Sequence, residues 1–524
     1  MSFEGQAHHP HRRGFPPNAH LLAQQRPPAN LELVQAHWFV RHGERAPVRQ
    51  RMVGLGAIPP VFNLCSIGKD FSQAVLSLAP TPALRPTVDS APSPSPFLSS
   101  SRHSTSATTS AFPPSSSKQA PPAVNGQSST IRRFTEDPPS ATTSHGRPTR
   151  GDVAACYWGE LTDLGRESTL RFGATLRHVY VDRLGFLPGR LDQRAVDDGV
   201  VQFRSTNMPR TIESLQQIIE GLYDGERERD PPRGVRVEIR VRNWMDENLY
   251  PNTASKRLRV LDAESIQRSA TEHNPSLATL DDAVVPVLGH ALRIDSSPRA
   301  NGILDTLMVC RAHGIDVPDV LARKDVLEVL EKGVVREWFD AYQVPEFRRL
   351  AMGRILSDLS SCLAHKIARP EEDPLKLAVY SCHDTSVGGI LNALDAFDGR
   401  WPPFTSHLGI ELMRQTPTPA TDSSTQPPGP SNPPSSSAPS FLSRFLPSPA
   451  ATLPPSSSSR DSSRHFVRLL YNGKPLALPA CQPVGSHLEG TQGTVCTYEA
   501  FERLLSEWKM GEKEWTEACN KGAE

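Results

Sequence analysis

Three short apolar runs in this chain each lead into a segment of charged or imidazole side chains. The runs are 38–40, 200–203 and 377–380, and the charged segments begin at Arg41, Arg204 and His383. Short apolar runs bounded by polar segments are typical of buried strands in a parallel sheet. The carboxyl ends of such strands meet at one edge of the sheet, where ligands bind. The spacing therefore predicts one pocket to which three separate parts of the chain contribute.

Strand and helix patterns alternate along the chain, which predicts an α/β fold: a three-layer αβα sandwich with a mainly parallel central sheet. We expect strands at 31–40, 200–203, 235–241 and 377–381, and helices at 162–182, 211–223 and 388–394. Thr162 is the candidate N-cap of the first of these helices. Residues 246–366 have a mostly helical pattern and predict a cap subdomain beside the sheet.

Low-complexity sequence interrupts this pattern. Residues 80–150 and 416–464 are rich in Ser, Pro, Thr and Ala, and we expect both insertions, like the tail 1–30, to be disordered. The catalytic domain would then consist of 31–79, 151–415 and 465–524. Residues 408–413 and 465–470 alternate in polarity and predict an antiparallel pair across the second insertion, followed by a hairpin turn at Asn472-Gly473.

The segment Arg41-His42-Gly43-Glu44-Arg45-Ala46-Pro47 places an imidazole between two guanidinium groups. Imidazole attacks phosphorus readily, and arginine forks bind phosphoryl oxygens in pairs. We expect Gly43 to let a substrate approach the backbone, because glycine has no Cβ. Alone, the segment would also fit a basic surface loop. Its occurrence together with two other charged strand ends favours a pocket that binds a phosphoryl group.

These motifs resemble those of the histidine acid phosphatases, branch 2 of the histidine phosphatase superfamily. The likeness lies in the RHGxRxP pattern of 41–47, in Arg204-Ser205-Thr206 and in His383-Asp384. Further segments look most like the lysophosphatidic acid phosphatase branch: 159–162, 249–252, 401–404 and 471–473. The resemblance covers most of the chain outside the Ser/Pro-rich stretches and implies a phosphoglycerate mutase-like fold.

The resemblance also implies a mechanism. His42 would be the nucleophile that forms a covalent phosphohistidine, and Asp384 the proton donor to the leaving alcohol. The phosphoryl oxygens would be held by Arg41, Arg45, Arg204 and His383. These groups account for the charge of a phosphoryl group, so we expect no metal ion and no cofactor. Glu44 lies inside the motif, and we expect it to orient an arginine rather than to act as an acid.

The substrate class is a phosphate monoester, and the resemblance points to a lysophospholipid. A phytase or a broad-specificity acid phosphatase remains an alternative. Lys256, Arg257 and Arg259 could serve a polyanion, although ordinary surface solvation explains them as well. An alternative of another class is a catalytically silent scaffold that works through its Ser/Pro-rich tracts.

Charge and hydropathy exclude some partners. Lys plus Arg and Asp plus Glu both total 57, so no overall field favours nucleic acid or an anionic membrane. No run approaches the roughly 20 apolar residues of a membrane span. The first 30 residues lack the apolar core of a secretory signal, which predicts an intracellular location, cytoplasmic or mitochondrial. His8-His9-Pro10-His11 could bind a metal, but a disordered tail explains this cluster equally well.

The eight cysteines have no zinc-ligand spacing. Cys382 falls at a strand end, and we expect it to be a small buried hydrophobe rather than a nucleophile. Cys481 and Cys496 bracket a Gly-containing loop and could pair in an oxidising compartment. For an intracellular chain, we expect them to be free thiols.

Overall fold

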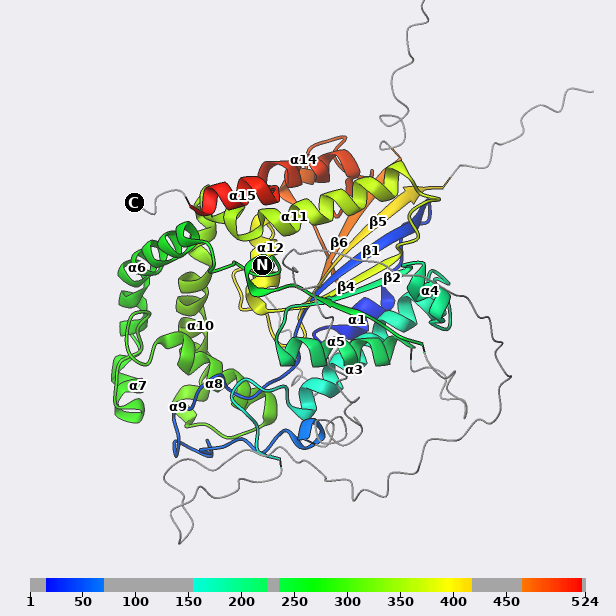
Figure 1. The fold of residues 1–524 in the computed structure, drawn as a ribbon. Coiled ribbons are helices and arrows are strands. Elements are labelled where there is room, and N and C mark those ends of the chain that lie inside the picture. Colours follow the sequence, from blue (N-terminus) through cyan, green and yellow to red (C-terminus); the bar gives the residue numbers. More distant parts are fainter. Residues whose placement is uncertain (1–15, 70–153, 224–234, 417–463, 521–524) are drawn as a thin grey trace, which may run out of the picture.

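The computed structural model describes residues 16–69, 154–223, 235–416 and 464–520. Its centre is a mixed sheet with the strand order β3-β2-β4-β1-β5-β6-β7, and β8 pairs with β6. Figure 1 shows β2, β4, β1, β5 and β6 of this sheet side by side. The strands are β1 (Leu31–Arg41), β2 (Val201–Ser205), β3 (Ile239–Val241), β4 (Leu377–Cys382), β5 (His407–Gln415), β6 (His465–Tyr471), β7 (Lys474–Leu476) and β8 (Val495–Thr497). The strands β3, β2, β4 and β1 are parallel, and β5 to β8 pair antiparallel. The predicted α/β class is confirmed, with the parallel half carrying the motifs.

One face of the sheet is covered by α3 (Asp163–Arg177) and α5 (Pro209–Tyr223). Their apolar side chains, among them Phe172 and Ile218, pack against Trp38 of β1 and Phe203 of β2. The predicted N-cap of α3 is confirmed, because the side chain of Thr162 accepts a hydrogen bond from the backbone N–H of Gly165.

The other face is covered by α11 (Pro345–Ala368), α12 (Asp384–Ala393) and α14 (Tyr498–Trp508). Buried α11 side chains such as Leu356 and Leu363 share a core with Ala378 of β4 and Leu412 of β5. The prediction that assigned residues up to 366 to the cap is therefore wrong for α11. A helical pattern shows which face is apolar, but not whether that face meets the sheet or the cap.

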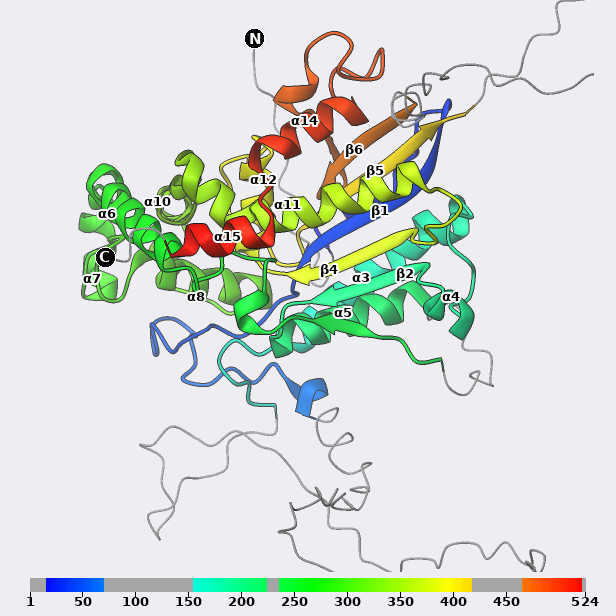
Figure 2. The same ribbon diagram turned by 45° about the horizontal axis from the view of Figure 1, so that its top comes forward.

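The cap consists of α6 (Lys256–Ala278), α7 (Asp281–Leu288), α8 (Ala300–His313), α9 (Asp319–Ala322) and α10 (Lys324–Phe339). It has its own apolar core, in which Leu277, Ile303, Leu307 and Leu330 are buried. Figure 2 shows the arrowhead of β4 directed toward these helices. The cap therefore lies beyond the carboxyl edge of the parallel strands, where ligands are expected.

The chain before β1 departs from prediction. Residues 19–24 form α1 (Ala19–Gln24), and Leu22 is completely buried. The side chain of Gln25 donates to the carbonyl of Gly473, 3.1 Å away, and Arg183 donates to that of Ala23. The expected disordered tail is therefore wrong for residues 16–30, because one buried leucine fixes this short segment to the C-terminal hairpin. Residues 1–15, with the histidine cluster, lie outside the described residues.

The predictions for the C-terminal strands are mostly confirmed. Strands β5 and β6 form the expected antiparallel pair. The turn at Asn472 and Gly473 is also confirmed, with φ angles of 47° and 75°, and it connects β6 to β7. Strand β3 is shorter than the predicted 235–241 and contains only Ile239–Val241.

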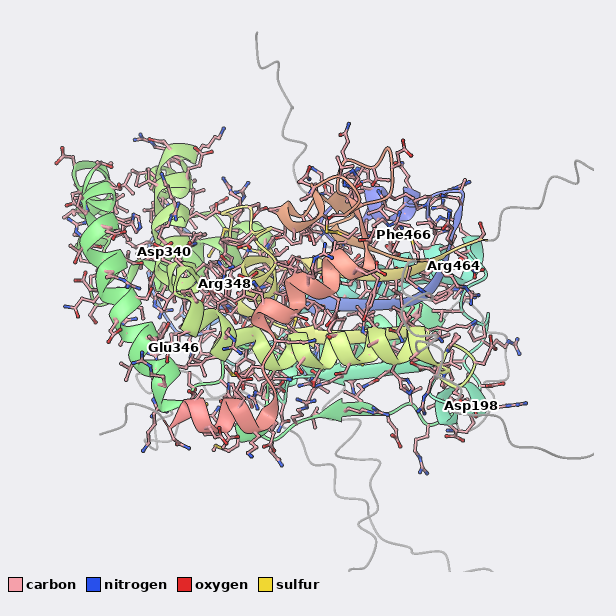
Figure 3. The ribbon with its side chains drawn as sticks, turned by 90° about the horizontal axis from the view of Figure 1, so that it is seen from above. Asp198, Asp340, Glu346, Arg348, Arg464 and Phe466 are labelled. Atoms are coloured by element: carbon pink, nitrogen blue, oxygen red, sulfur yellow. A yellow bond between two sulfur atoms is a disulfide. The ribbon has the colours of Figure 1, made fainter. Side chains whose placement is uncertain are left out.

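Both predicted insertions fall largely on residues 70–153 and 417–463, outside the described part of the chain. The second joins β5 to β6, and the backbone N–H of Gln415 donates to the carbonyl of Arg464, 2.8 Å away. Figure 3 shows Arg464 and Phe466 on the opposite side of the molecule from Asp340 and Glu346, which lie on the cap side. The second insertion therefore leaves and re-enters the sheet at the edge away from the cap.

Two disulfide bonds are present, Cys65–Cys156 and Cys481–Cys496. The expectation of free thiols at Cys481 and Cys496 is therefore wrong: their Cα atoms are 5.3 Å apart, within bonding range. Cys382 is a free and buried side chain, as expected. Among the described residues, no helix is both long and apolar enough to cross a membrane.

Candidate active site

The three charged segments lie together because their strands are neighbours in the order β2-β4-β1. Arg41 ends β1 and is paired with Cys382, which ends β4. The backbone N–H of His42 donates to the carbonyl of Cys382, 3.0 Å away. The predicted convergence at the carboxyl edge is thus found for His42, His383 and Asp384.

His42 is buried, and a hydrogen bond determines which of its two ring nitrogens carries the hydrogen. Its Nδ1 lies 2.8 Å from the carbonyl oxygen of Gly43. A carbonyl only accepts, so Nδ1 carries the hydrogen and Nε2 keeps a free lone pair. Burial lowers the pKa of His42 well below its usual value, and the positive charges of Arg210 and Arg41 lower it further. The neutral imidazole is therefore maintained under acidic conditions.

His383 stands beside His42, with the two rings edge to face and their centroids 5.7 Å apart. Its Nε2 is 3.0 Å from the hydroxyl of Thr206, the residue that follows β2. Burial, and then the charge of Arg210, lower the pKa of His383 to about 3. The ring of Tyr250 also packs edge to face against that of His383, with the two centroids 5.6 Å apart.

Asp384 is the first residue of α12 and forms an ion pair with Arg41 at 2.8 Å. Burial alone would raise the pKa of Asp384, but Arg41 and Arg45 outweigh it and hold the pKa below its usual value. The guanidinium of Arg41 also donates to the carbonyl of Pro402 at 2.5 Å and lies 4.3 Å from the ring centre of Phe404. Arg41 is thus fixed from three sides.

Arg45 is held by the cap. Its guanidinium forms a 2.8 Å ion pair with Asp305 of α8 and donates to the carbonyl of Ala46, 3.1 Å away. It also lies 5.7 Å from the ring centre of Phe404, which it shares with Arg41. Phe404 therefore contacts both guanidinium groups of the motif.

Arg204 and Arg210 have different surroundings. Arg204 donates to the carboxylate of Glu247 at 2.6 Å and to the amide oxygen of Asn248 at 2.7 Å. Arg210, in the first turn of α5, is the strongest charge acting on the pKa of both His42 and His383. Burial, and then Arg45, lower the pKa of Arg210 itself to about 10.

Sequence reasoning missed Arg210 because it considered only the arginine at the end of the strand. The available signal was Pro209, which marks the start of a helix directly after that strand. Side chains in the first turn of such a helix face the carboxyl edge of the sheet, where anions bind.

Gly43 and Glu44 serve the packing of α3. A Cβ on Gly43 would lie 2.3 Å from the carbonyl oxygen of Gly165, so the missing side chain accommodates α3 rather than a substrate. The carboxylate of Glu44 accepts a 2.6 Å hydrogen bond from Ser168, whose hydroxyl is also 2.9 Å from that of Thr405. The expectation that Glu44 directly orients an arginine is not supported by these contacts.

Two other features lie away from His42. Among the described residues, a group with metal-ligand spacing is formed by Glu272, His273 and Asp340 on the cap. Asp340 also pairs with Arg336 at 3.2 Å. A cavity of about 480 Å³ lies beside Val201, at the amino end of β2, and thus at the other end of the strands.

The fold and the site define an α/β protein in which two histidines, an aspartate and several arginines gather at the carboxyl edge of the parallel strands. A family model of the histidine phosphatase superfamily (branch 2) matches residues 32–472, and the chain belongs to this family. The family resemblance of the motifs is thereby confirmed.

The chain is 32% identical over 487 residues to a probable acid phosphatase of Schizosaccharomyces pombe, with 91% of each chain covered. It is 28% identical to lysophosphatidic acid phosphatase type 6 of Bos taurus, over 68% of this chain and 70% of that protein. The phytase of Klebsiella sp ASR1 superposes with a TM-score of 0.47 and 12% identity, covering 92% of this chain and 96% of the phytase. That last likeness is too low to bear on the substrate.

Proposed function

We propose that this protein is an acid phosphatase that hydrolyses phosphate monoesters through a phosphohistidine on His42. The observation that carries the proposal is the Nε2 lone pair of His42, left free by the Nδ1 hydrogen bond to Gly43, among arginine side chains. A neutral imidazole can attack phosphorus, and a protonated one cannot. Because its pKa lies well below the usual value, His42 remains a nucleophile in acid.

The phosphoryl group is held by Arg41, Arg45, Arg210 and His383, with Arg210 in the role first expected for Arg204. The Nε–H groups of Arg41, Arg45 and Arg210 are buried and have no hydrogen-bond partner among the described residues. Buried donors without acceptors cost about 1–3 kcal/mol each. An anion bound among these side chains supplies acceptors and stabilises the charge that develops in the transition state.

The reaction has two balanced steps. The Nε2 of His42 forms a bond to phosphorus while the ester P–O bond breaks, and the leaving oxygen takes a proton from Asp384. A water molecule then attacks the phosphohistidine, the P–N bond breaks, and Asp384 accepts a proton from that water. Orthophosphate leaves, and both side chains regain their initial states.

Asp384 is a carboxylate in the free protein, because Arg41 and Arg45 hold its pKa down. A bound phosphoryl group competes for Arg41 and adds negative charge beside Asp384, and both effects raise the pKa of that carboxyl. Alternatively the substrate brings the proton, since phosphate monoesters bind a second proton with a pKa of about 6. The substrate route loses its proton as the pH rises above about 6, and the carboxyl route loses it as the pH rises through the raised pKa of Asp384, so both routes favour an acidic optimum.

The experiment is hydrolysis of p-nitrophenyl phosphate in the presence of EDTA from pH 4 to 8. Turnover with a maximum in acid, together with acid-quenched label on His42, is the expected result. Absence of turnover over the whole range would favour the alternative of a catalytically silent scaffold with function in its Ser/Pro-rich tracts.

A lysophospholipid is our candidate substrate, supported by apolar side chains near Arg210. Val48 and Trp158 are 41% and 44% exposed. The point where a Cβ on Gly159 would lie is 3.6 Å from the Arg210 guanidinium and 3.7 Å from Val48. An apolar rim beside a cationic pocket suits a phosphate monoester with an acyl chain.

We expect lysophosphatidate to exceed glycerol 3-phosphate in kcat/KM, and Trp158→Ser to reduce this preference. Phytate hydrolysed faster than lysophosphatidate would favour the phytase alternative.

The two disulfides support an oxidising compartment, because the cytosol keeps thiols reduced. This revises the cytoplasmic and mitochondrial expectation, while an intracellular location stays a prediction. Alkylation of thiols in intact cells, followed by non-reducing peptide mapping, tests it: alkylated Cys65 or Cys481 would argue for a reducing compartment.

A further inference from the structure

Asp305 is an acidic side chain that the cap brings to the active site. It lies on α8, and its side chain is only 14% exposed. One carboxylate oxygen is 2.8 Å from the guanidinium of Arg45, and the other accepts from the backbone N–H of Val48 at 3.1 Å. Burial lowers the pKa of Arg41 and of Arg210, and the negative charge of Asp305 opposes this lowering, so its field reaches all three arginines around His42.

The proposed reaction leaves this carboxylate without a role. His42 forms the covalent bond, Asp384 carries the proton, and the arginines need an anion between them rather than a second carboxylate beside them. A pocket shaped only for binding phosphate would gain affinity if Asp305 were neutral, because like charges repel strongly when little water lies between them. The position of Asp305 therefore weakens the binding of some anions.

We propose that Asp305 is a specificity-determining residue that selects substrates with a single phosphate group and disfavours those with a second phosphate beside the scissile one. The proposal rests on the phosphatase function above. A carboxylate offers about four lone-pair directions, of which Arg45 and Val48 use two. A substrate hydroxyl next to the ester can donate to the others, whereas a phosphate in the same place is repelled. The same side chain thus favours a free hydroxyl and acts against a neighbouring phosphate.

The test compares two substrates that share one ring: myo-inositol 1-phosphate and myo-inositol hexakisphosphate. The measured quantity is kcat/KM for the hexakisphosphate divided by that for the monophosphate. Asp305→Asn removes the charge with little change in size, and we expect it to raise this ratio about tenfold. Asp305→Glu keeps the charge and should leave the ratio within about twofold of the wild type.

Asp282→Asn is the matched control, since Asp282 is an exposed acid in the first turn of α7, also in the cap. It should change neither the ratio nor the rate. Asp305→Ser replaces the asparagine variant if that protein does not fold. For variants too slow to assay, calorimetry in a His42→Ala background compares the Kd of the hexakisphosphate with that of orthophosphate, and the same tenfold relative gain is expected.

An unchanged ratio in Asp305→Asn, with the wild type still hydrolysing the monophosphate, would overturn the role of Asp305. An equal rise of the ratio in Asp305→Glu would do the same, because it would assign the effect to packing and not to charge. A wild-type protein that hydrolyses neither substrate nor p-nitrophenyl phosphate would instead contradict the phosphatase function itself.

Discussion

At the scale of single residues, the tautomer of His42 decides the chemistry. Since Nδ1 is committed to the carbonyl of Gly43, only Nε2 of His42 can attack in the proposed mechanism, whereas Nε2 of the neighbouring His383 lies 3.0 Å from the hydroxyl of Thr206. We expect His42→Ala to lower turnover by ~10⁴-fold or more and to abolish the phosphoenzyme. Acid-quench labelling checks this, with His37→Gln as a control, because His37 is buried in β1 away from the motif loop. Label on serine or aspartate would contradict the assignment.

Asp384 should matter most for substrates with poor leaving groups. An alkoxide needs a proton as the P–O bond breaks, whereas p-nitrophenolate leaves without one. We expect Asp384→Asn to lower the single-turnover rate for glycerol 3-phosphate by about 10²–10⁴-fold and to affect p-nitrophenyl phosphate much less. If the alkyl-to-aryl ratio of rates equals that of the wild type, Asp384 is not the donor, and Glu44 becomes the next carboxyl to test.

Arg204 and Arg210 should differ in what their loss affects. We expect Arg210→Ala to reduce kcat for alkyl and aryl substrates alike, by about 10²–10³-fold, because the developing charge loses a donor. Arg204→Ala leaves Glu247 buried without its cationic partner, and breaking such a pair costs about 3–5 kcal/mol of stability. Urea unfolding and kinetics on both variants separate the two roles. A larger loss of kcat in Arg204→Ala than in Arg210→Ala would indicate that Arg204 is the arginine that binds the phosphoryl group.

The residues of the site were predictable to the extent that they follow strands. His42, His383 and Asp384 come directly after buried apolar runs, and the topology brings such positions together. Arg210 and Asp305 begin or lie within helices, where the sequence gives the period of the helix but not the residue it faces. Asp305 in particular belongs to no motif, and only the docking of α8 on the loop after β1 places it near Arg45.

At the scale of elements, β5 and β6 form one hairpin despite the 47 residues between Thr416 and Arg464 that lie outside the described structure. Their ends are already joined by the 2.8 Å hydrogen bond from Gln415 to Arg464. Replacing 417–463 by a short Gly/Ser loop should leave kcat within a few-fold, because loop closure depends only weakly on length. Activity and thermal unfolding check this. A variant that no longer folds would show that the insertion contributes to the core.

The strands and most helices were predictable, because β4 and the second half of β1 are buried apolar runs, and β6 has an alternating pattern. The wrong predictions concern how two helices pack against the rest of the fold. α11 was assigned to the cap because its pattern resembles that of the helices before it, and α1 was missed because a single buried leucine among prolines makes no periodic signal. Both depend on tertiary packing, which outweighs local pattern.

At the scale of the whole molecule, buried histidines make stability depend on pH. Burial lowers the pKa of His37 and His407 to about 4 and that of His383 to about 3. Below pH 6.5 the unfolded chain binds protons that the folded chain does not, so stability rises with pH between about 4 and 6.5. Lowering the pH from 7 to 5 should reduce the free energy of unfolding by ~2 kcal/mol for each of these histidines. Urea unfolding at both values measures this, and His37→Gln should remove no more than about one quarter of the difference, because the buried His42 contributes in the same direction. A pH-independent stability would contradict the buried neutral forms.

The disulfide between Cys65 and Cys156 also determines what a cut by a protease would do to the protein. The two cysteines flank residues 70–153, so a backbone cut anywhere in that stretch would divide the chain without releasing either piece. One piece would carry His42 and the other Asp384, and both would remain covalently attached through a bond inside the folded body. The protein can therefore persist as a two-chain enzyme, which runs as one band on a non-reducing gel and as two after reduction.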